Sequence, residues 1–187
     1  MGEKYSALKP AHINFIENQK MFFVATAPQQ GRINLSPKGL DTLRIINENR
    51  ILWLNLTGSG NETAAHLAED PRITIMFNAF EGNPLILRLY GTARSIHDDD
   101  QEWNHLITNF PDLPGKRQII DVKIETVQTS CGFGVPLYEY KGQRNELIRW
   151  AEKKGDDGLI KYRKEKNMIS MDGKSIRNNS SRSNNGY

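Results

Sequence analysis

The alternation of hydrophobic and polar positions predicts a chain built mainly of short β-strands. Residues 21–27, 50–56 and 72–78 are apolar, β-prone runs of the length that strands have. Residues 32–36 predict a further strand, which a turn at residues 29–31 joins to the first. These two strands are therefore expected to form a hairpin.

Two longer runs predict strands with one buried face. Residues 85–95 place leucines on one face and Arg88 on the other. Residues 117–129 turn isoleucine and valine inward and charged residues outward. Both runs fit a sheet whose inner side is apolar, because successive side chains of a strand point to opposite faces.

Two short helices are predicted in the first half of the chain. Residues 10–18 begin with Pro10, which suits a first helical turn. Residues 61–69 form an Ala-rich run with Asn61 as its expected cap, and Pro71 stops it. The first helix is expected to precede the strands, and the second is expected to connect two of them.

Helical patterns also occur in the second half. Residues 98–110 carry aromatic and aliphatic side chains at i, i+3, i+4 and i+7, which predicts an amphipathic helix with Asp98 as its N-cap. Residues 145–154 and 157–166 predict two further helical pieces.

This order of elements predicts a mainly β fold, a β-barrel with peripheral helices. A doubly wound parallel sheet is disfavoured, because it needs a helix after nearly every strand. The domain is expected to span residues 1–173. The Asn-, Ser- and Arg-rich residues 174–187 are expected to form a disordered tail.

The composition fits one intracellular domain. The chain has 187 residues, of which 37% are hydrophobic, enough for a single core. No apolar run approaches the roughly 20 residues of a membrane helix, and residues 1–10 lack the apolar core of a signal peptide. The single cysteine, Cys131, excludes an internal disulfide. We therefore expect a cytoplasmic protein without a membrane association.

The net charge of +3 is unevenly distributed. Residues 161–187 contain seven Lys or Arg and two acids, a net of +5, which leaves about −2 for the preceding 160 residues. Such a basic end can contact nucleic acid, but more often it is a solvated terminus. A nucleic-acid partner is therefore not expected.

The first candidate for anion binding is the segment from Arg32 to Gly39. The alternation puts Arg32, Asn34 and Ser36 on one face, and Lys38 follows a proline at the strand end. Cationic and hydroxyl donors of this kind can hold a phosphate. The alternative is an ordinary hairpin end with solvated charges.

The second candidate is the segment from Thr57 to Thr63, which joins a strand to the start of a helix. Its glycines allow the backbone to approach a ligand, and free N–H groups and polar side chains lie beside them. It matches neither the P-loop nor the dinucleotide glycine pattern. The alternative is an ordinary Gly/Ser turn before a helix.

Other candidates are weaker. Arg88 lies on the polar face of an apolar strand and would complete an anion site if the fold brought it beside Arg32. The alternative is an exposed or ion-paired arginine. The four histidines show no paired ligand spacing, so no metal site is predicted.

Six segments, taken in their order, resemble a known family. They are residues 32–39, 51–57, 61–72, 87–93, 127–140 and 167–173. The first four are similar to the phosphate strand, the flavin strand, the short helix ending in Leu-Ala-x-x-Pro-Arg and the Arg-x-x-Gly strand of the pyridoxamine 5′-phosphate oxidase-like superfamily of FMN-binding split barrels. The last two resemble an uncharacterised branch of that superfamily.

The resemblance implies a homodimer with two FMN sites at its interface. It implies that Arg32 holds the phosphate and that Ser36 and Lys38 lie near the flavin. The implied cofactor-binding residues are Arg32, Asn34, Ser36, Lys38, Asn55, Thr57, Asn61, Glu62, Thr63 and Arg88.

Two departures from the family pattern affect these expectations. Thr63 falls where the oxidase has a phosphate-binding lysine, so the phosphate would rely more on Arg32, Arg88 and the helix start. The Trp-x-x-x-Arg-Leu ending that binds the vitamin phosphate is absent. Oxidation of pyridoxamine phosphate is therefore not predicted.

The resemblance implies an FMN-dependent oxidoreductase of unknown small-molecule substrate, in which the cofactor transfers hydride and the protein orients it. One alternative is a flavin-binding carrier or sensor without turnover. Another is a split barrel that uses deazaflavin F420 or haem.

Overall fold

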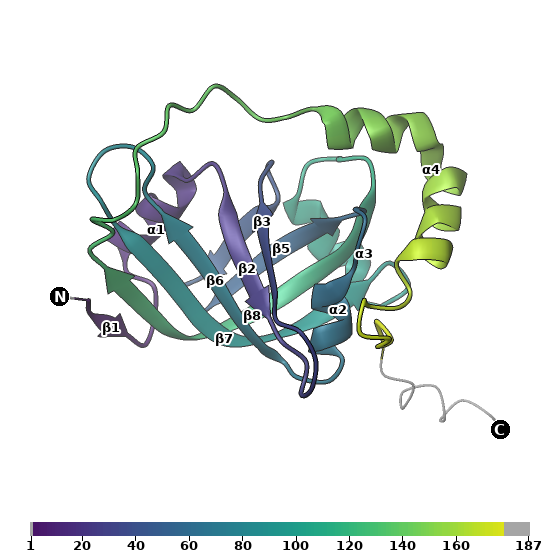
Figure 1. Ribbon diagram of the computed structural model, residues 1–187, viewed down its shortest axis with the longest axis horizontal. Helices are drawn as coiled ribbons and strands as arrows, with labels where there is room; N and C mark the ends of the chain where they lie inside the picture. Colours follow the sequence, from purple (N-terminus) through teal and green to yellow (C-terminus); the bar gives the residue numbers. More distant parts are fainter. Residues whose placement is uncertain (1, 178–187) are drawn as a thin grey trace.

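The computed structural model describes residues 2–177, and its centre is a curled antiparallel sheet (Figure 1). The strands pair in the order β3-β2-β6-β7-β8-β5-β4, and β1 pairs with β8. Within the described chain, the end strands β3 and β4 do not pair with each other, so the barrel is split. The strands are β1 (Lys4–Tyr5), β2 (Phe22–Thr26), β3 (Asn34–Lys38), β4 (Leu43–Asn47), β5 (Arg50–Leu56), β6 (Arg72–Asn78), β7 (Ile86–His97) and β8 (Lys116–Ser130).

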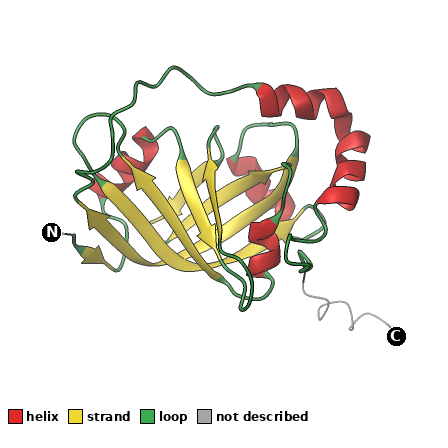
Figure 2. Cartoon of the chain, viewed as in Figure 1, coloured by secondary structure: helices red, strands yellow, loops and turns green. Residues whose placement is uncertain are grey.

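The helices lie around this sheet (Figure 2). They are α1 (Pro10–Asn18), α2 (Glu62–Leu67), α3 (Trp103–Leu106), the 3-10 helix η1 (Ile107–Asn109) and α4 (Glu146–Lys166). The mainly β fold with peripheral helices is therefore confirmed.

Most strands lie where the residue pattern placed them. β5 and β6 coincide with the predicted runs, and β2 and β3 form the predicted hairpin. The short strands β1 and β4 were not predicted. β4 is a five-residue edge strand with no fully buried residue, so its sequence lacks the alternation of a half-buried strand.

The inner face of the sheet buries the main core. Val24, Ile51 and Ile75 have no exposed surface. Trp53 packs edge-on against Phe22, with ring centroids 6.2 Å apart. Burial of apolar surface at roughly 25 cal/mol per Å² makes this core the main source of stability. Because these side chains fill the middle of the barrel, space for a ligand remains only toward its ends.

The predicted helix over residues 98–110 is wrong in its first turns. The residues before Trp103 form turns, and a short α3 is followed by the 3-10 helix. The carboxylate of Asp100 accepts the backbone N–H of His97 at 2.7 Å, which closes a turn instead of starting a helix. The apolar side still packs as expected, because Leu106 is buried in a second cluster on the outer face of the sheet.

α4 contains both helical pieces predicted near the C-terminus. They meet at Gly155, whose φ of 64° lies in the left-handed region that glycine adopts without strain. α4 runs along one side of the barrel (Figure 1). Among the described residues, no helix is both long and apolar enough to cross a membrane.

The segment after α4, residues 167–177, returns to the barrel beside α2 (Figure 1). We call it the latch. Ile176 is 8% exposed and packs with Ala64 and Ala65 of α2. Residues 174–177 of the predicted tail thus belong to the latch, and its remainder, residues 178–187, lies outside the described residues.

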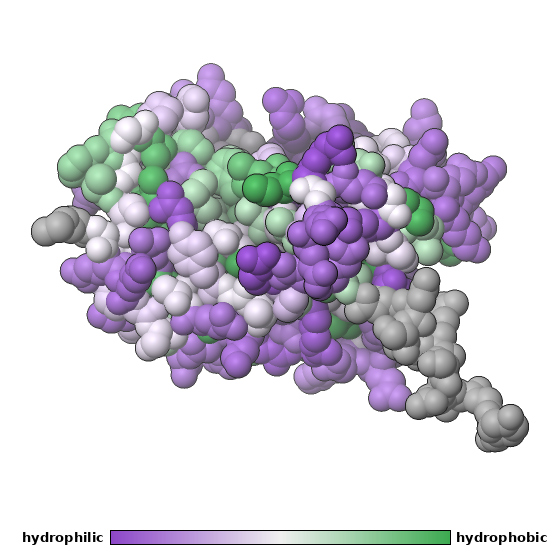
Figure 3. Space-filling model, turned by 60° about the horizontal axis from the view of Figure 1, so that its bottom comes forward, coloured by the Kyte–Doolittle hydropathy of each residue, from purple (hydrophilic) through white to green (hydrophobic). Residues whose placement is uncertain are grey.

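Exposed hydrophobic residues gather at the opposite end of the barrel. In Figure 3 they form the green area where the loops after β6 and β8 lie. Phe133 and Leu137, in the loop after β8, are 81% and 74% exposed. Hydrophilic residues cover much of the rest of this face.

Candidate functional site

The inner faces of β3 and β5 become polar toward one end of the barrel. The β2–β3 register pairs Ser36 with Val24 and Lys38 with Phe22, so both side chains lie on the core side of β3. On β5, Asn55 shares the inward face of the core residue Trp53. The β5–β8 register pairs Asn55 with Gln118, whose side chain accepts a hydrogen bond from the Asn55 amide at 3.0 Å. We call Ser36, Lys38, Asn55 and Gln118 the polar mouth.

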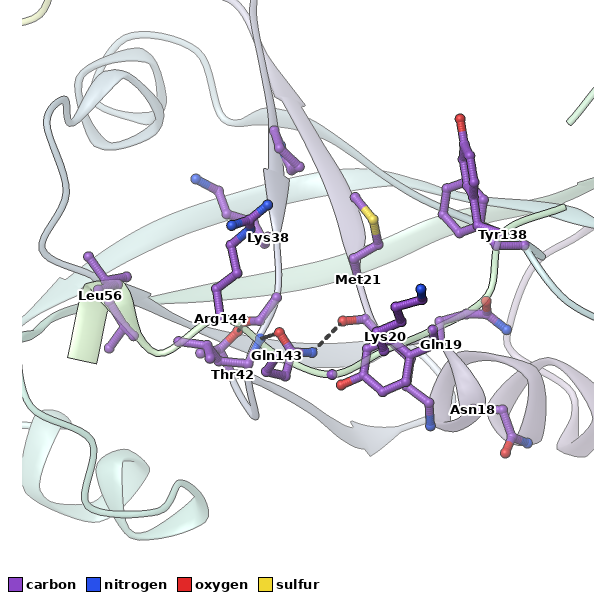
Figure 4. A pocket seen from close by; sticks show the side chains of 18 of the residues that line it. Asn18, Gln19, Lys20, Met21, Lys38, Thr42, Leu56, Tyr138, Gln143 and Arg144 are labelled. Atoms are coloured by element: carbon purple, nitrogen blue, oxygen red, sulfur yellow. Dashed lines mark hydrogen bonds between the residues drawn. The ribbon is translucent and has the colours of Figure 1, made fainter. Parts of the chain in front are cut away.

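The polar mouth borders a large pocket of about 1260 Å³ (Figure 4). Lys38, Trp53 and Asn55 line its inner side, and the residues that follow α1 line another. Residues 138–147, which we call the strap, cross its outer side. The strap therefore forms a wall of the pocket that the barrel alone does not supply.

A few hydrogen bonds hold the strap in place. The Gln143 amide donates to the carbonyl oxygen of Lys20 at 2.9 Å, and its oxygen accepts the N–H of Leu40 at 3.3 Å (Figure 4). The N–H of Tyr138 donates to the carbonyl oxygen of Phe80 at 2.9 Å. Arg144, in the same segment, extends toward Lys38 in Figure 4.

Lys38 places a positively charged ammonium group at a largely buried position. Its Nζ lies 4.9 Å from the centre of the Trp53 ring. Burial, and then the nearby charge of Arg117, lower the pKa of Lys38 to about 8. No described carboxylate is among the groups that shift this pKa, so the ammonium can attract an anionic or electron-rich group in the pocket.

Two buried polar atoms near the pocket have no hydrogen-bond partner among the described residues. They are Ser36 Oγ and Gln118 Nε2. An unpaired buried polar group costs roughly 1–3 kcal/mol. A planar ligand with carbonyl and nitrogen acceptors along one edge would remove that cost, so the donor set fits the ring system of a flavin.

A second polar cluster lies at the start of α2, where the latch covers it. Asn61 donates from its amide to the carbonyl oxygen of Asn167 at 3.2 Å and makes no side-chain cap to α2. The carboxylate of Glu62 accepts the N–H of Met171 at 3.1 Å. Two residues expected to hold phosphate thus contact the latch in this structure.

The remaining predicted residues of this region also have partners. Arg32 is exposed and forms an ion pair with Asp172 of the latch, whose carboxylate also accepts the Arg32 N–H at 2.7 Å. The hydroxyl of Thr57 accepts from Arg163 Nε at 2.9 Å. Asn34 and Thr63 come together, with 3.4 Å between the amide nitrogen and the hydroxyl oxygen.

Arg88 lies apart from both clusters. The register pairs it with Met76 on β6 and with Gln128 on β8, on the face opposite the buried Leu87 and Leu89. Its guanidinium donates to Ser130 Oγ at 3.2 Å. The fold therefore does not bring Arg88 beside Arg32, because β2 and β6 separate their strands.

The residue pattern missed two side chains that the structure places here, Arg117 and Gln118. Both are buried, at 7% and 0% exposure. In the sequence, these two residues stand directly before the apolar run of β8, and this placement of a charged and an amide residue could have marked them as candidates. A strand start is usually exposed to solvent, but the segment before α2 and the latch contact Arg117 through Gly60 and Asn167.

No metal centre is formed by the described part of the chain, which contains no group of three or more His, Cys, Asp or Glu side chains placed to hold an ion.

Comparison with known proteins identifies related chains. The family model for pyridoxamine 5′-phosphate oxidase matches residues 8–131, which include strands β2 to β8 but not β1, the strap or the latch. A pyridoxamine 5′-phosphate oxidase family protein, ustO of Aspergillus flavus, is 38% identical over 140 residues, which cover 72% of this chain. Those residues span only 56% of that relative's length.

Solved structures share the fold at low sequence identity. HupZ of Group A Streptococcus superposes with a TM-score of 0.52 at 18% identity, covering 64% of this chain and 91% of the HupZ chain. A Lactobacillus delbrueckii protein described as a candidate pyridoxamine 5′-phosphate oxidase gives a TM-score of 0.54 at 18% identity, covering 66% of this chain and 94% of that protein. The likeness is one of split-barrel architecture.

Proposed function

Because the chain belongs to the pyridoxamine 5′-phosphate oxidase family, we propose that it is a flavoprotein that binds FMN and acts as an oxidoreductase on a small molecule. The observation that carries this proposal is the set of unpartnered buried donors at the polar mouth, Ser36 Oγ and Gln118 Nε2, which have no partner among the described residues. Gln118 is hydrogen-bonded to Asn55, and Ser36 lies on the same face of β3 as Lys38. Asn55 and Lys38 both line the pocket.

In this proposal, the polar mouth binds the flavin ring and the pocket also holds a second molecule. Ser36, Asn55 and Gln118 would hydrogen-bond the polar edge of the flavin ring, and Lys38 would hold an electron-rich atom beside it. The volume of about 1260 Å³ exceeds the roughly 300–1,000 Å³ of common ligand pockets, so there is room for a cofactor and a second molecule.

Bound FMN would supply hydride transfer, and the protein would supply orientation and exclusion of water. The strap closes the outer side of the pocket and places aromatic side chains there, among them Tyr138 and Tyr140. Aromatic walls favour a flat substrate, because they provide a large contact area without hydrogen-bonding demands.

The absorbance spectrum of the purified protein tests this function. The protein is mixed with FMN, desalted and compared with an untreated sample. We expect flavin bands that survive desalting, and bleaching of those bands by a reductant. A Soret band would assign haem instead, and flavin bands without turnover in a substrate screen would assign a carrier or sensor. A protein that retains no flavin refutes the proposal, and F420 would then be tested.

Two variants examine the observation that carries the proposal. Ser36→Ala and Gln118→Leu each remove one unpartnered donor, and each should weaken flavin binding roughly 3- to 10-fold if that donor binds the ring. Ser130→Ala is the matched control, because Ser130 lies at the far end of β8. Full flavin affinity in both site variants would remove the polar mouth from the cofactor site.

We also propose that the protein is a homodimer in the cytoplasm. Ile33 and Leu35 are 77% and 63% exposed at the edge strand β3, and a sheet edge of this kind is normally covered. The exposed free thiol of Cys131 suits a reducing compartment. Sedimentation equilibrium should give twice the chain mass, and Leu35→Asp should shift the protein to a monomer. A monomeric wild-type protein at micromolar concentration would refute the dimer.

A further inference from the structure

Arg117 is a buried cation at the start of β8, with 7% of its surface exposed. Its Nη1 donates to the carbonyl oxygen of Gly60 at 2.9 Å and to Asn167 Oδ1 at 2.8 Å. Its Nε has no hydrogen-bond partner among the residues that the structure describes. The guanidinium is thus held in position by neutral oxygen atoms, and part of its donor set is unused.

The charges that act on Arg117 do not neutralise it. Burial lowers the pKa of Arg117, and the neighbouring Arg163 lowers it further. Arg117 in turn contributes to the lowered pKa of Lys38. Within residues 2–177, none of the groups found to shift the pKa of Arg117 is a carboxylate. A buried ion without a counter-ion costs several kcal/mol, and a bound anion would offset that cost.

We propose that Arg117 binds the phosphate group of the flavin cofactor, a role that rests on the proposed function. Gly60, which accepts from Arg117, lies two residues before α2 and three before Thr63. Thr63 is the position where the family resemblance implies a phosphate-binding lysine. Arg117 therefore supplies, from a neighbouring strand, the positive charge that this helix start lacks.

Arg32 is less suited to this task in the described conformation. Its side chain is 68% exposed and is paired with the carboxylate of Asp172. A phosphate at Arg32 would have to displace that carboxylate. Arg117, by contrast, offers a desolvated guanidinium, and hydrogen bonds to charged groups are stronger away from water.

Asn167 of the latch is the positioning residue for Arg117. It is 1% exposed, accepts from Arg117 through its side-chain oxygen, and donates to the carbonyl oxygen of Gly58 at 3.1 Å. A neutral amide orients the guanidinium and leaves its charge available. A carboxylate at the same position would neutralise that charge, and this difference provides a test.

The test compares FMN with riboflavin, which has the same ring system but no phosphate. Dissociation constants are measured by flavin-fluorescence titration for the full-length wild-type protein and for Arg117→Met. We expect the wild type to prefer FMN. In Arg117→Met, FMN affinity should fall roughly 10- to 100-fold, since a charge-assisted hydrogen bond is lost, while riboflavin affinity stays unchanged.

Asn167→Asp keeps the proposal testable if Arg117→Met folds poorly, because it retains the arginine and adds a counter-ion. It should lose most of the preference for FMN over riboflavin. Arg50→Met is the matched control, since Arg50 is a partly buried arginine paired with Asp121 on β8 and should keep the wild-type preference. An unchanged preference in both Arg117→Met and Asn167→Asp would overturn the assignment.

If the protein does not bind flavin at all, the same titrations give a result that differs from the loss of Arg117 as a phosphate ligand. If neither flavin binds the wild type, flavin binding is refuted, and inorganic phosphate is then titrated by calorimetry. Saturable phosphate binding that Arg117→Met abolishes would retain Arg117 as an anion site. Absence of phosphate binding, or binding that Arg117→Met leaves intact, would overturn the anion site itself.

Discussion

The strap and the latch cover neighbouring parts of the same barrel in different ways. The strap crosses a pocket of about 1260 Å³ and is held mainly by backbone groups and the Gln143 amide. The latch covers the start of α2 with a dense polar network. Asp172 and Lys174 form ion pairs with Arg32 and Glu69, and Asn167 contacts both the segment before α2 and the start of β8.

This difference indicates which side of the site exchanges ligands. A segment with few anchors over an open volume can move at low cost, whereas a buried network opens only with much of the fold. The strap is therefore the wall of the pocket that opens more readily, whereas the latch is a fixed part of the structure around the start of α2. Four substitutions test this comparison.

The largest effect is expected for Asn167→Ala. It removes one of the two oxygen partners of the buried Arg117 Nη1 and the amide that donates to the Gly58 carbonyl, so the free energy of unfolding should fall by about 2–4 kcal/mol. Urea denaturation provides the measurement. Asn145→Ala, at an exposed position before α4, is the control and should change stability little. Equal stability of Asn167→Ala and wild type would contradict a structural latch.

Lys38→Met should raise the free energy of unfolding by about 1–2 kcal/mol at neutral pH, because the buried ammonium is disfavoured in the fold. The folded-state pKa of about 8 lies below the ordinary lysine pKa of 10.5, so between these values the unfolded chain binds more protons. Wild-type stability should therefore rise with pH across that window.

Thermal unfolding of the wild type and of Lys38→Met, measured as a function of pH, checks whether stability rises with pH as predicted. Lys38→Met should lack the rise that the wild type shows between the two pKa values. Lys20→Met, at an exposed lysine, should keep it. Parallel profiles for wild type and Lys38→Met would show that Lys38 is not desolvated.

Gln143→Ala should loosen the strap by about 1 kcal/mol and affect global stability less. Hydrogen exchange should accelerate in residues 138–147 and stay unchanged in residues 167–177. Faster exchange in both segments would mean that strap and latch open together, and it would remove the distinction between them.

The smallest effect is expected for Arg32→Ala. An exposed ion pair contributes roughly 0–1 kcal/mol, so stability should change by less than that. FMN affinity should fall less than in Arg117→Met, which ranks the two arginines directly. A larger loss in Arg32→Ala would place the phosphate at Arg32 and require Asp172 to move away.

Most of the barrel could be predicted from the residue pattern, because a strand with one buried face requires apolar residues at every second position. β5 and β6 are apolar through their middle, and β8 alternates over Ile120, Val122 and Ile124. The helix over residues 98–110 was only partly predictable. Its apolar face is correct, but local hydrogen bonds of Asp100 interrupt the backbone.

The sequence by itself determined most of the strands, the family and the segments where polar ligands could lie. Each of these depends on residues close together in the chain. Only the tertiary structure decided which cation is buried and which is neutralised. Arg32 and Asp172 are 140 residues apart, and Arg117 and Asn167 are 50 apart. Burial and charge pairing are properties of packed surfaces, so no local pattern around Arg32 or Arg117 could reveal them.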